Sequence, residues 1–255
     1  MEHLAICYGK IWNFSVAFTT IKTVSFDEYS WMWYHNAVKE VSILKDIPVF
    51  DTENGVGSLI LKEISYTQTA YVKIASVSNF AAYLDECIGF CRAVGADTIY
   101  ATGHEDLRSY PYHTSILTME CLRNSIADTD AALIPVTEDT LVQWLTIYRS
   151  KMKRILNAAY LSDADGKQML QRGDGYYIYR DQTLLGIGIA AGNMIDLVAS
   201  VQPGGGRHIV QAMKKILTGE TIFLEVAAEN QKAIRLYESL GFVQKAIRSK
   251  WYKIF

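Results

Sequence analysis

The clearest pattern of apolar and polar positions lies near the end of the chain, in the stretch LEVAAENQKAIRLYESLGF at 224–242. Leu224 and Val226 belong to a β-prone run that alternates with polar positions. Asn230 is a good N-cap for the residues that follow, and Gly241 is a good C′ residue. Between them, apolar residues recur at i, i+3, i+4 and i+7, which is typical of one face of a helix. That face consists of Ala233, Leu236, Tyr237 and Leu240.

The same reading predicts helices and strands along the rest of the chain. In the first half, Ser25 and Glu28 form a capping box for a helix, and a second helix is expected at 81–94, with strands at 57–65, 69–77 and 98–100. In the second half, helices are expected at 141–152, 163–172 and 207–217, and strands at 176–180, 184–190, 195–201, 221–227 and 242–254. This mixture predicts an α/β or α+β sheet flanked by helices.

Two short segments of the first half return in the second half at nearly the same distance. ASV at 75–77 returns at 199–201, an offset of 199 − 75 = 124, and TIY at 98–100 returns as TIF at 221–223, an offset of 221 − 98 = 123. An amphipathic helix is expected between the two echoes in each half. The repeat predicts a duplication with a first domain at 1–128 and a second at 129–255, separated in the polar segment NSIADTD at 124–130.

Composition excludes several classes of protein. The chain has 255 residues, 50% of them hydrophobic, and a net charge of −2, which suffices for one large or two ordinary domains and argues against nucleic-acid binding. No signal peptide or membrane span is expected, so a cytoplasmic location follows by default. Four scattered cysteines predict reduced core residues, and the histidines lack metal-site spacing. The cysteines are Cys7, Cys87, Cys91 and Cys121.

A glycine-rich loop follows the strand at 195–201 and precedes the helix at 207–217. It reads QPGGGRH at 202–208. Glycines let the main chain approach a ligand, and the first-turn amides of a helix favour an anion such as phosphate. A flexible turn is the alternative explanation of the glycines alone.

Together with the pattern N-x-x-A-x-x-L-Y-x-x-x-G-F at 230–242, this order of strand, loop, helix and strand resembles the GNAT superfamily of GCN5-related N-acetyltransferases. The resemblance covers about 133–255 and, through the repeat, extends loosely over the first half. It implies two tandem GNAT-like domains, each a mixed, mostly antiparallel sheet flanked by helices. The first copy lacks both the glycines and the final pattern, so it is expected to be degenerate, with acyl-CoA bound by the second.

The resemblance also implies a site for acetyl-CoA, between the strand that ends near Val201 and the strand at 221–227. The pantetheine would pair with the first of these strands, and the pyrophosphate would bind the amides of the loop at 204–208. Two registers of the loop remain open, one with Gly205 as first glycine and one with Gly204 and Gly206 as the pair. The expected cofactor-binding residues are Ala199, Val201, Gly204, Gly205, Gly206, Arg207, His208, Asn230, Ala233 and Tyr237.

The implied chemistry is direct attack of a neutral primary amine, from a small molecule or a peptide, on the thioester. Tyr237 would protonate the leaving thiolate, and Asp196 or Glu225 would take the proton of the amine. Neither a metal nor a covalent cysteine intermediate is expected. The aromatic segments at 28–35 and 175–179 belong either to an amine pocket or to the core. A non-catalytic acyl-CoA sensor and a Fem-like aminoacyltransferase are the alternatives, and the protein is expected to be a monomer or homodimer.

Overall fold

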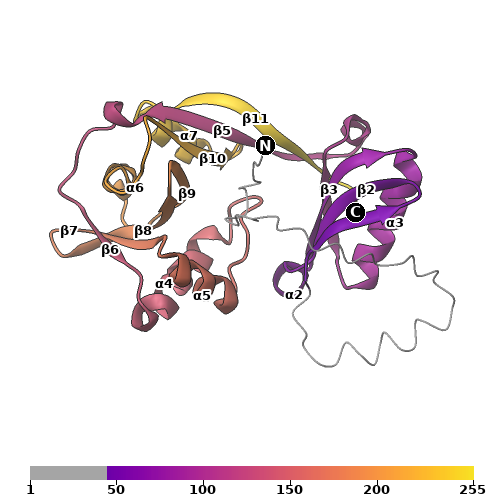
Figure 1. Cartoon of the computed structure of the whole chain (residues 1–255), viewed down its shortest axis with the longest axis horizontal. Helices are drawn as coiled ribbons and strands as arrows, with labels where there is room; N and C mark the ends of the chain where they lie inside the picture. The colour runs from indigo at the N-terminus through magenta and orange to yellow at the C-terminus, as the bar shows by residue number, and fades with distance from the viewer. Residues whose placement is uncertain (1–44) are drawn as a thin grey trace. The chain divides into compact units, whose positions relative to one another are not determined.

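The computed structural model describes residues 45–255, and these form two compact units (Figure 1). The C-terminal unit comprises Thr114–Lys250, and the N-terminal unit comprises residues 45–113 with Trp251–Phe255. Strands β5 (Tyr112–Leu122) and β11 (Val243–Lys253) contribute residues to both units. The helix expected from Ser25, the aromatic segment at 28–35 and Cys7 lie outside the described residues.

In the C-terminal unit the strands are hydrogen-bonded in the order β5-β10-β9-β8-β7-β6. All neighbours are antiparallel except β9 and β10, which confirms the expected mixed, mostly antiparallel sheet. The strands are β6 (Ala132–Pro135), β7 (Gly175–Arg180), β8 (Thr183–Ala191), β9 (Met194–Ser200) and β10 (Thr221–Ala227). The helices are α4 (Glu138–Met152), α5 (Asp163–Arg172), α6 (Gly205–Met213) and α7 (Gln231–Glu238). Each except β6, for which no strand was predicted, matches a predicted element within a few residues.

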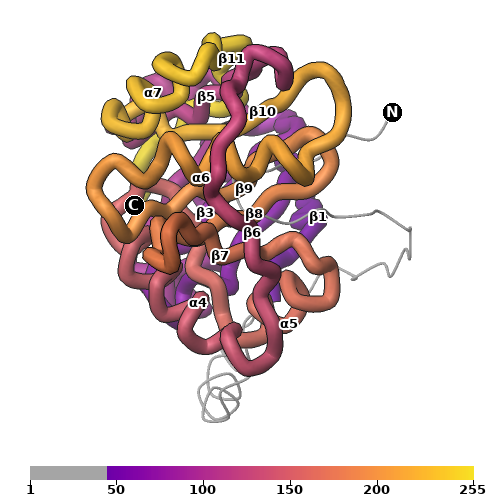
Figure 2. Tube along the Cα trace, turned by 90° about the vertical axis from the view of Figure 1, so that its left-hand side faces the viewer, coloured from indigo at the N-terminus to yellow at the C-terminus, as the bar shows by residue number. Residues whose placement is uncertain are grey.

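Helices cover both faces of this sheet. Figures 1 and 2 show α6 and α7 on one side of the strands and α4 and α5 on the other. Each pair has its own apolar core: Met213 and Ile234 belong to one cluster, and Trp144 and Met169 belong to the other. Alternate residues of the strands supply the two clusters because successive side chains point to opposite faces.

Two glycines let α6 pack closely on the sheet. A Cβ at Gly186 would lie 2.2 Å from the Ala199 carbonyl oxygen and 2.6 Å from Ile209 Cδ1 of α6. A Cβ at Gly188 would lie 1.6 Å from the Met213 methyl. Glycine at these two positions therefore fixes the height of α6 above β8, and with it the place of the loop that precedes α6.

The N-terminal unit repeats the strand–helix–strand order on a smaller scale. Its strands β1 (Ile47–Thr52), β2 (Gly55–Ile60), β3 (Thr69–Val77) and β4 (Thr98–Thr102) are followed in the sheet by the end of β11. Helix α3 (Phe80–Ala93) buries Cys87 and Cys91, as its pattern predicted. The strand expected at 57–65 is wrong beyond Ile60, because Asp46 Oδ1 accepts hydrogen bonds from the amides of Leu61 and Lys62 and the short helix α2 (Ile64–Thr67) follows.

The chain passes from one compact unit to the other between residues 113 and 114 and again between residues 250 and 251. The domain limits at 128 and 129 concern the duplication, and they stay a prediction. No helix among residues 45–255 is long and apolar enough to cross a membrane.

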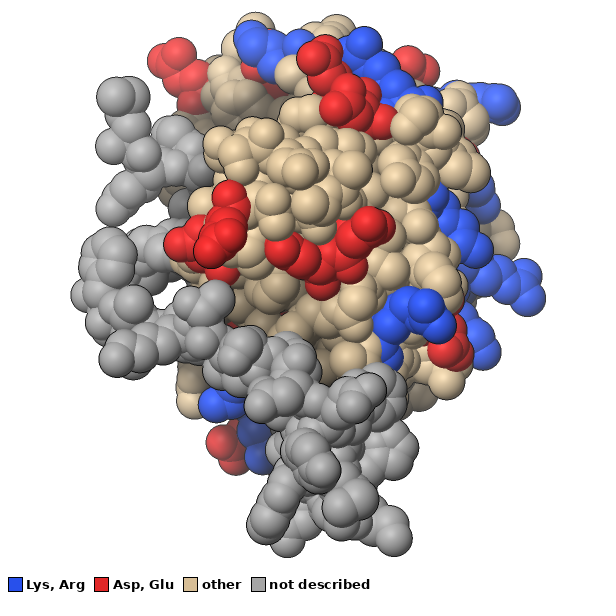
Figure 3. All heavy atoms as spheres, turned by 90° about the vertical axis from the view of Figure 1, so that its right-hand side faces the viewer, with Lys and Arg blue, Asp and Glu red and all other residues tan. Residues whose placement is uncertain are grey.

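Figure 3 shows one face of the molecule, where acidic side chains lie near the middle and Lys and Arg lie toward the top and right. The described atoms of that face do not form the central basic patch typical of nucleic-acid binders.

Candidate functional site

Strands β9 and β10 begin as parallel neighbours and then separate. Their pairing covers only Met194 with Phe223 and Ile195 with Leu224. Beyond these pairs, β10 remains bound to β5 on its other side, and β9 remains bound to β8. The main chain of residues 196–200 thus faces a gap in the sheet, where its amides and carbonyls can pair with an extended ligand instead of a strand.

A β-bulge marks the start of the gap. Ile189 pairs with Leu197 and Ala190 pairs with Ile195, so that Asp196 is the extra residue of β9. A bulge bends its strand and redirects a side chain. Here it explains why the alternation of the sequence could not tell which way Asp196 points.

The gap opens into a cavity of about 580 Å³ in the C-terminal unit. Its wall includes β9, the loop at 202–204, the end of β10, helix α7, and the segment between α4 and α5. The three residues predicted to be catalytic, Asp196, Glu225 and Tyr237, all line it. The cavity also includes Ala199, Val201, Gly204, Gly206, Asn230 and Ala233 of the predicted cofactor residues.

Asp196 has the electrostatics of a general base. Burial, together with the nearby negative charge of Asp174 and against the opposing effect of Arg172, raises the pKa of its carboxyl to about 6. Its Oδ1 atom is buried, and among the described residues nothing donates a hydrogen bond to it. A carboxylate that is ionised at neutral pH, poorly solvated and unsaturated in hydrogen bonds is suited to accept a proton.

Glu225 also has a buried carboxylate oxygen, Oε2, but unlike Asp196 it forms an ion pair through its other oxygen. Its Oε1 atom is 3.0 Å from Nε of Arg248, and its side chain is 6% exposed. An ion pair stabilises the charged carboxylate and so weakens it as a base. Between the two candidates left open by the sequence, the structure therefore favours Asp196.

Tyr237 combines a buried ring with a place in the cavity wall. The residue is 7% exposed, and its ring centroid lies 5.9 Å from that of Phe242. Burial raises the pKa of its phenol to about 12, which keeps it protonated and able to donate at neutral pH. A thiol has a reference pKa near 8.5, below that of this phenol. The phenol is therefore best suited to donate a hydrogen bond to the developing thiolate.

The glycine loop separates into an open and a packed part. Gly204 has φ +79° and open space around it, whereas a Cβ on Gly205 would lie 2.8 Å from Ser200 Oγ and 3.1 Å from the Leu185 carbonyl oxygen. The amide of Gly205 already donates to the Gln202 carbonyl. Gly206 lines the cavity, and its amide belongs to the first turn of α6, where no preceding helical carbonyl is available. The register with Gly204 and Gly206 as the pair fits this arrangement.

Comparison with known proteins agrees with this geometry. The pattern of the FR47-like protein family matches residues 195–252, which include β9, the loop, α6, β10 and α7. No curated protein matches the chain significantly in sequence.

Several solved structures have the same fold. A functionally unknown conserved protein from Staphylococcus epidermidis is 12% identical, with a TM-score of 0.54 over 84% of this chain and 95% of that one. A candidate acetyltransferase from Pyrococcus horikoshii is 12% identical, with a TM-score of 0.55 over 79% and 69%. A GCN5-related N-acetyltransferase from Kribbella flavida is 8% identical, with a TM-score of 0.51 over 90% and 65%. The chain has the GNAT fold. The matches extend over both halves, as expected for a tandem GNAT arrangement.

Two predicted residues of the GNAT phosphate loop do not line the cavity with their side chains. Arg207 is exposed, and its Nη2 donates to Ser239 Oγ at 2.8 Å. The His208 ring contacts Thr129 Oγ1 at 3.3 Å and Arg180 Nη1 at 3.1 Å, toward β6 and β7. The His208 side chain therefore points away from the loop, and contact of its amide with the cofactor stays a prediction. Gly205 likewise does not line the cavity.

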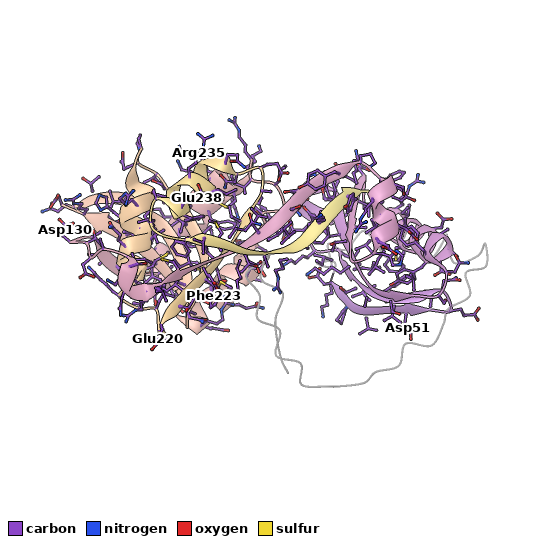
Figure 4. The ribbon with its side chains drawn as sticks, turned by 90° about the horizontal axis from the view of Figure 1, so that it is seen from above. Asp51, Asp130, Glu220, Phe223, Arg235 and Glu238 are labelled. Carbon is purple, nitrogen blue, oxygen red and sulfur yellow. The ribbon has the colours of Figure 1, made fainter. Side chains whose placement is uncertain are left out.

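Helix α7 has the local structure that its sequence predicted. Asn230 Oδ1 accepts a hydrogen bond from the Ala233 amide at 3.2 Å, and Gly241 adopts φ +93°. The inner face of α7 lines the cavity with Ala233 and Tyr237. Figure 4 shows Arg235 and Glu238 on its outer face, pointing away from the strands. Cofactor contact by Asn230 and Ala233 stays a prediction, with their placement in its favour.

Sequence reasoning missed the wall formed by α4, α5 and the segment between them. Tyr148 donates from its hydroxyl to the Ala159 carbonyl at 2.7 Å and thereby holds the segment in place. Asn157 lies there with φ +56° and lines the cavity. Arg172, at the end of α5, also lines it and pairs with the buried Asp174. The sequence pointed to this wall only through the Arg-Gly-Asp between a predicted helix and a predicted strand. These residue types are also common in ordinary turns, so the segment did not stand out.

The remaining candidates for chemistry belong to the core. Tyr177 of the aromatic segment at 175–179 packs in the cluster with Trp144, so this segment does not line the cavity. Cys87, Cys91 and Cys121 are buried and free. Burial raises the pKa of the Cys87 and Cys91 thiols to about 12, which makes them unreactive. In the described part of the chain no group of three or more His, Cys, Asp or Glu side chains could hold a metal.

Proposed function

We propose that this protein is an N-acetyltransferase that transfers an acetyl group from acetyl-CoA to a primary amine by direct attack. The observation that carries the proposal is the separation of β9 from β10 at a bulge that places Asp196 in the same cavity as Tyr237. The main chain of β9 would bind the pantetheine, and the loop around Gly204 and Gly206 would bind the pyrophosphate. Acetyl-CoA is a substrate in this proposal, and no metal takes part.

Asp196 is the proton acceptor in the proposed reaction, and Tyr237 is the donor. The ammonium form of the amine loses a proton to Asp196, directly or through water, and the neutral nitrogen attacks the thioester carbonyl carbon. The carbon–nitrogen bond forms, and the carbon–sulfur bond breaks as the tetrahedral intermediate collapses. Tyr237 gives its phenol proton to the leaving thiolate, which becomes free CoA, and regains a proton through water from the nitrogen, which must lose its second proton to become an amide. The net reaction is ammonium plus acetyl-CoA to amide, CoA and one proton, which Asp196 holds until it passes to solvent, so that atoms and charge balance without a covalent enzyme intermediate.

The test is a panel of amines, amino acids and aminoglycosides incubated with acetyl-CoA, with release of free thiol as the readout. Isothermal titration calorimetry of acetyl-CoA gives the number of sites, which we expect to be one per chain. Tight binding without turnover of any amine would favour a non-catalytic acyl-CoA sensor. Failure to bind acetyl-CoA would overturn the proposal altogether.

A further inference from the structure

Arg172 is a fixed cation in the cavity wall. It is the last residue of α5, and its Nε and Nη2 donate to the two carboxylate oxygens of Asp174 at 2.5 and 3.3 Å. Asp174 is itself 5% exposed, and its main-chain carbonyl accepts from the Ala190 amide at 3.1 Å. Because the partner is buried and anchored to β8, the guanidinium plane is held in one orientation.

One edge of that guanidinium remains open. Arginine presents five N–H donors in a planar fork, and Asp174 occupies the edge formed by Nε and Nη2. The other edge consists of Nη1 and the second hydrogen of Nη2, and no described residue accepts from it. The Arg172 side chain is 35% exposed, so this edge is accessible. Two parallel N–H groups match the two oxygens of a carboxylate.

This fork lies nearer to Asp196 than to the phosphate loop. Its partner Asp174 accepts at its main-chain carbonyl from the Ala190 amide, and Ala190 pairs with Ile195, the residue before Asp196 in β9. The loop begins after Ser200, and four residues of extended chain span roughly 13 Å. Arg172 is therefore placed beside the proposed base rather than beside the pyrophosphate.

The other charged groups of the cavity do not form a site for a polycation. Asp165 accepts hydrogen bonds from the Ser162 amide and hydroxyl, and Glu225 is paired with Arg248. Two exposed lysines, Lys151 and Lys232, add positive charge to the wall. The cavity wall also includes apolar side chains, namely Met152, Ile155 and Met169. Such a wall suits an anionic, partly apolar acceptor better than a polyamine.

We propose that the acceptor is a primary amine that also carries a carboxylate, as a free apolar amino acid does. Its carboxylate binds the open edge of Arg172, its amine lies at Asp196, and its side chain contacts the apolar wall. This inference rests on the proposed acetyltransferase function and narrows its substrate class.

The experiment compares leucine, leucinamide and 3-methylbutylamine as acceptors for the full chain with acetyl-CoA. The decisive quantity is the ratio of kcat/KM for leucine to that for leucinamide, measured in wild type and in the double variant Arg172→Gln/Asp174→Asn. The double variant is used because Arg172→Gln alone would leave the buried Asp174 charge unpaired and destabilise the fold. The amines of leucine and leucinamide have different pKa values. Because the same two compounds are compared in both proteins, the effect of this difference on the ratio cancels.

We expect the ratio to fall roughly 10- to 10²-fold in the double variant, with leucinamide changed only a few-fold, as for a lost charge-assisted hydrogen-bond pair. Arg172→Lys should give an intermediate ratio because the charge stays and the fork is lost. Lys167→Gln is the matched control, since Lys167 is an exposed cation of the same helix α5 that does not line the cavity, and its ratio should stay as in wild type.

Three results would overturn the inference while leaving acetyltransfer intact. They are an unchanged ratio in the double variant, an equal fall of the ratio in Lys167→Gln, and a preference for phosphoethanolamine over leucine. Absence of turnover with every amine, despite bound acetyl-CoA, would instead overturn the proposed function itself. The melting temperature of each variant, taken alongside, shows whether the protein remains folded.

Discussion

The two units share an order of elements and differ in how far their parallel strands pair. In the N-terminal unit β3 and β4 pair over five residues, from Thr69 with Thr98 to Lys73 with Thr102. In the C-terminal unit β9 and β10 pair over two. The first pair of strands is closed, whereas the second opens into the cavity. The two strand–helix–strand units thus share an order of elements, and of their parallel strand pairs only β9 and β10 separate to form a cavity.

The helices that follow these strands also begin differently. Asn79 caps α3 with its own side chain, which accepts from the Ala82 amide at 3.2 Å. Gly204 precedes α6 and offers no side-chain cap. One helix start is therefore partly satisfied from within the protein, and the other leaves first-turn amides for an anion. Four experiments test this contrast, from the largest expected effect to the smallest.

Asp196→Asn should abolish most turnover, by roughly 10²- to 10⁴-fold, because it removes the proposed base and keeps the shape of the side chain. In wild type, kcat/KM should rise with pH through about 6, where Asp196 loses its proton, and this limb should be missing in the variant. The melting temperature at pH 7 should rise, because a folded pKa above the unfolded value means that the buried charge destabilises the fold at that pH. Full activity in the variant would make Glu225 or water the base.

Tyr237→Phe should lower turnover by roughly 10²-fold, because it removes the hydroxyl and keeps the packed ring. The affinity for acetyl-CoA, measured by calorimetry, should stay nearly unchanged. If stability falls instead while turnover persists, the hydroxyl serves a structural hydrogen bond, and the leaving thiolate is protonated by water.

Gly204→Asp should weaken acetyl-CoA binding by roughly tenfold or more, because a carboxylate would face the pyrophosphate at an anion site. Gly192→Asp is the matched control: Gly192 also has positive φ and open space around it, but it lies in the turn between β8 and β9. Both variants place the same charge on a residue with positive φ and open surroundings, so that the main difference between them is position. An equal loss of affinity in the two would place the phosphates elsewhere.

Asn79→Ala and Asn230→Ala form the finest comparison between the units. Each removes a side-chain cap with the same 3.2 Å hydrogen bond to the amide three residues on, so each should cost about 1 kcal/mol in the free energy of unfolding. Only Asn230→Ala should also weaken acetyl-CoA binding. A similar change of affinity in both variants would contradict a single site in the C-terminal unit.

The sequence by itself determined the secondary structure and the repeat. Helix α7 with its cap at Asn230 and its end at Gly241, the capped helix α3, and the strands at both echoes follow from local rules of periodicity, capping and φ preference. These rules involve residues only a few positions apart, and so they can be applied to the sequence alone. The pattern at 230–242 likewise located Tyr237 in the site.

Only the tertiary structure decided which predicted residues meet. The bulge that turns Asp196 into the cavity depends on its register with β8, and the pairing of Glu225 with Arg248 depends on a residue 23 positions away (248 − 225 = 23). The packing of Gly205 and the direction of the His208 side chain depend on the position of α6 relative to β8, β6 and β7. The open edge of Arg172 exists because Asp174 is anchored to β8. Such features arise from contacts between strands, which the local pattern of the chain does not encode.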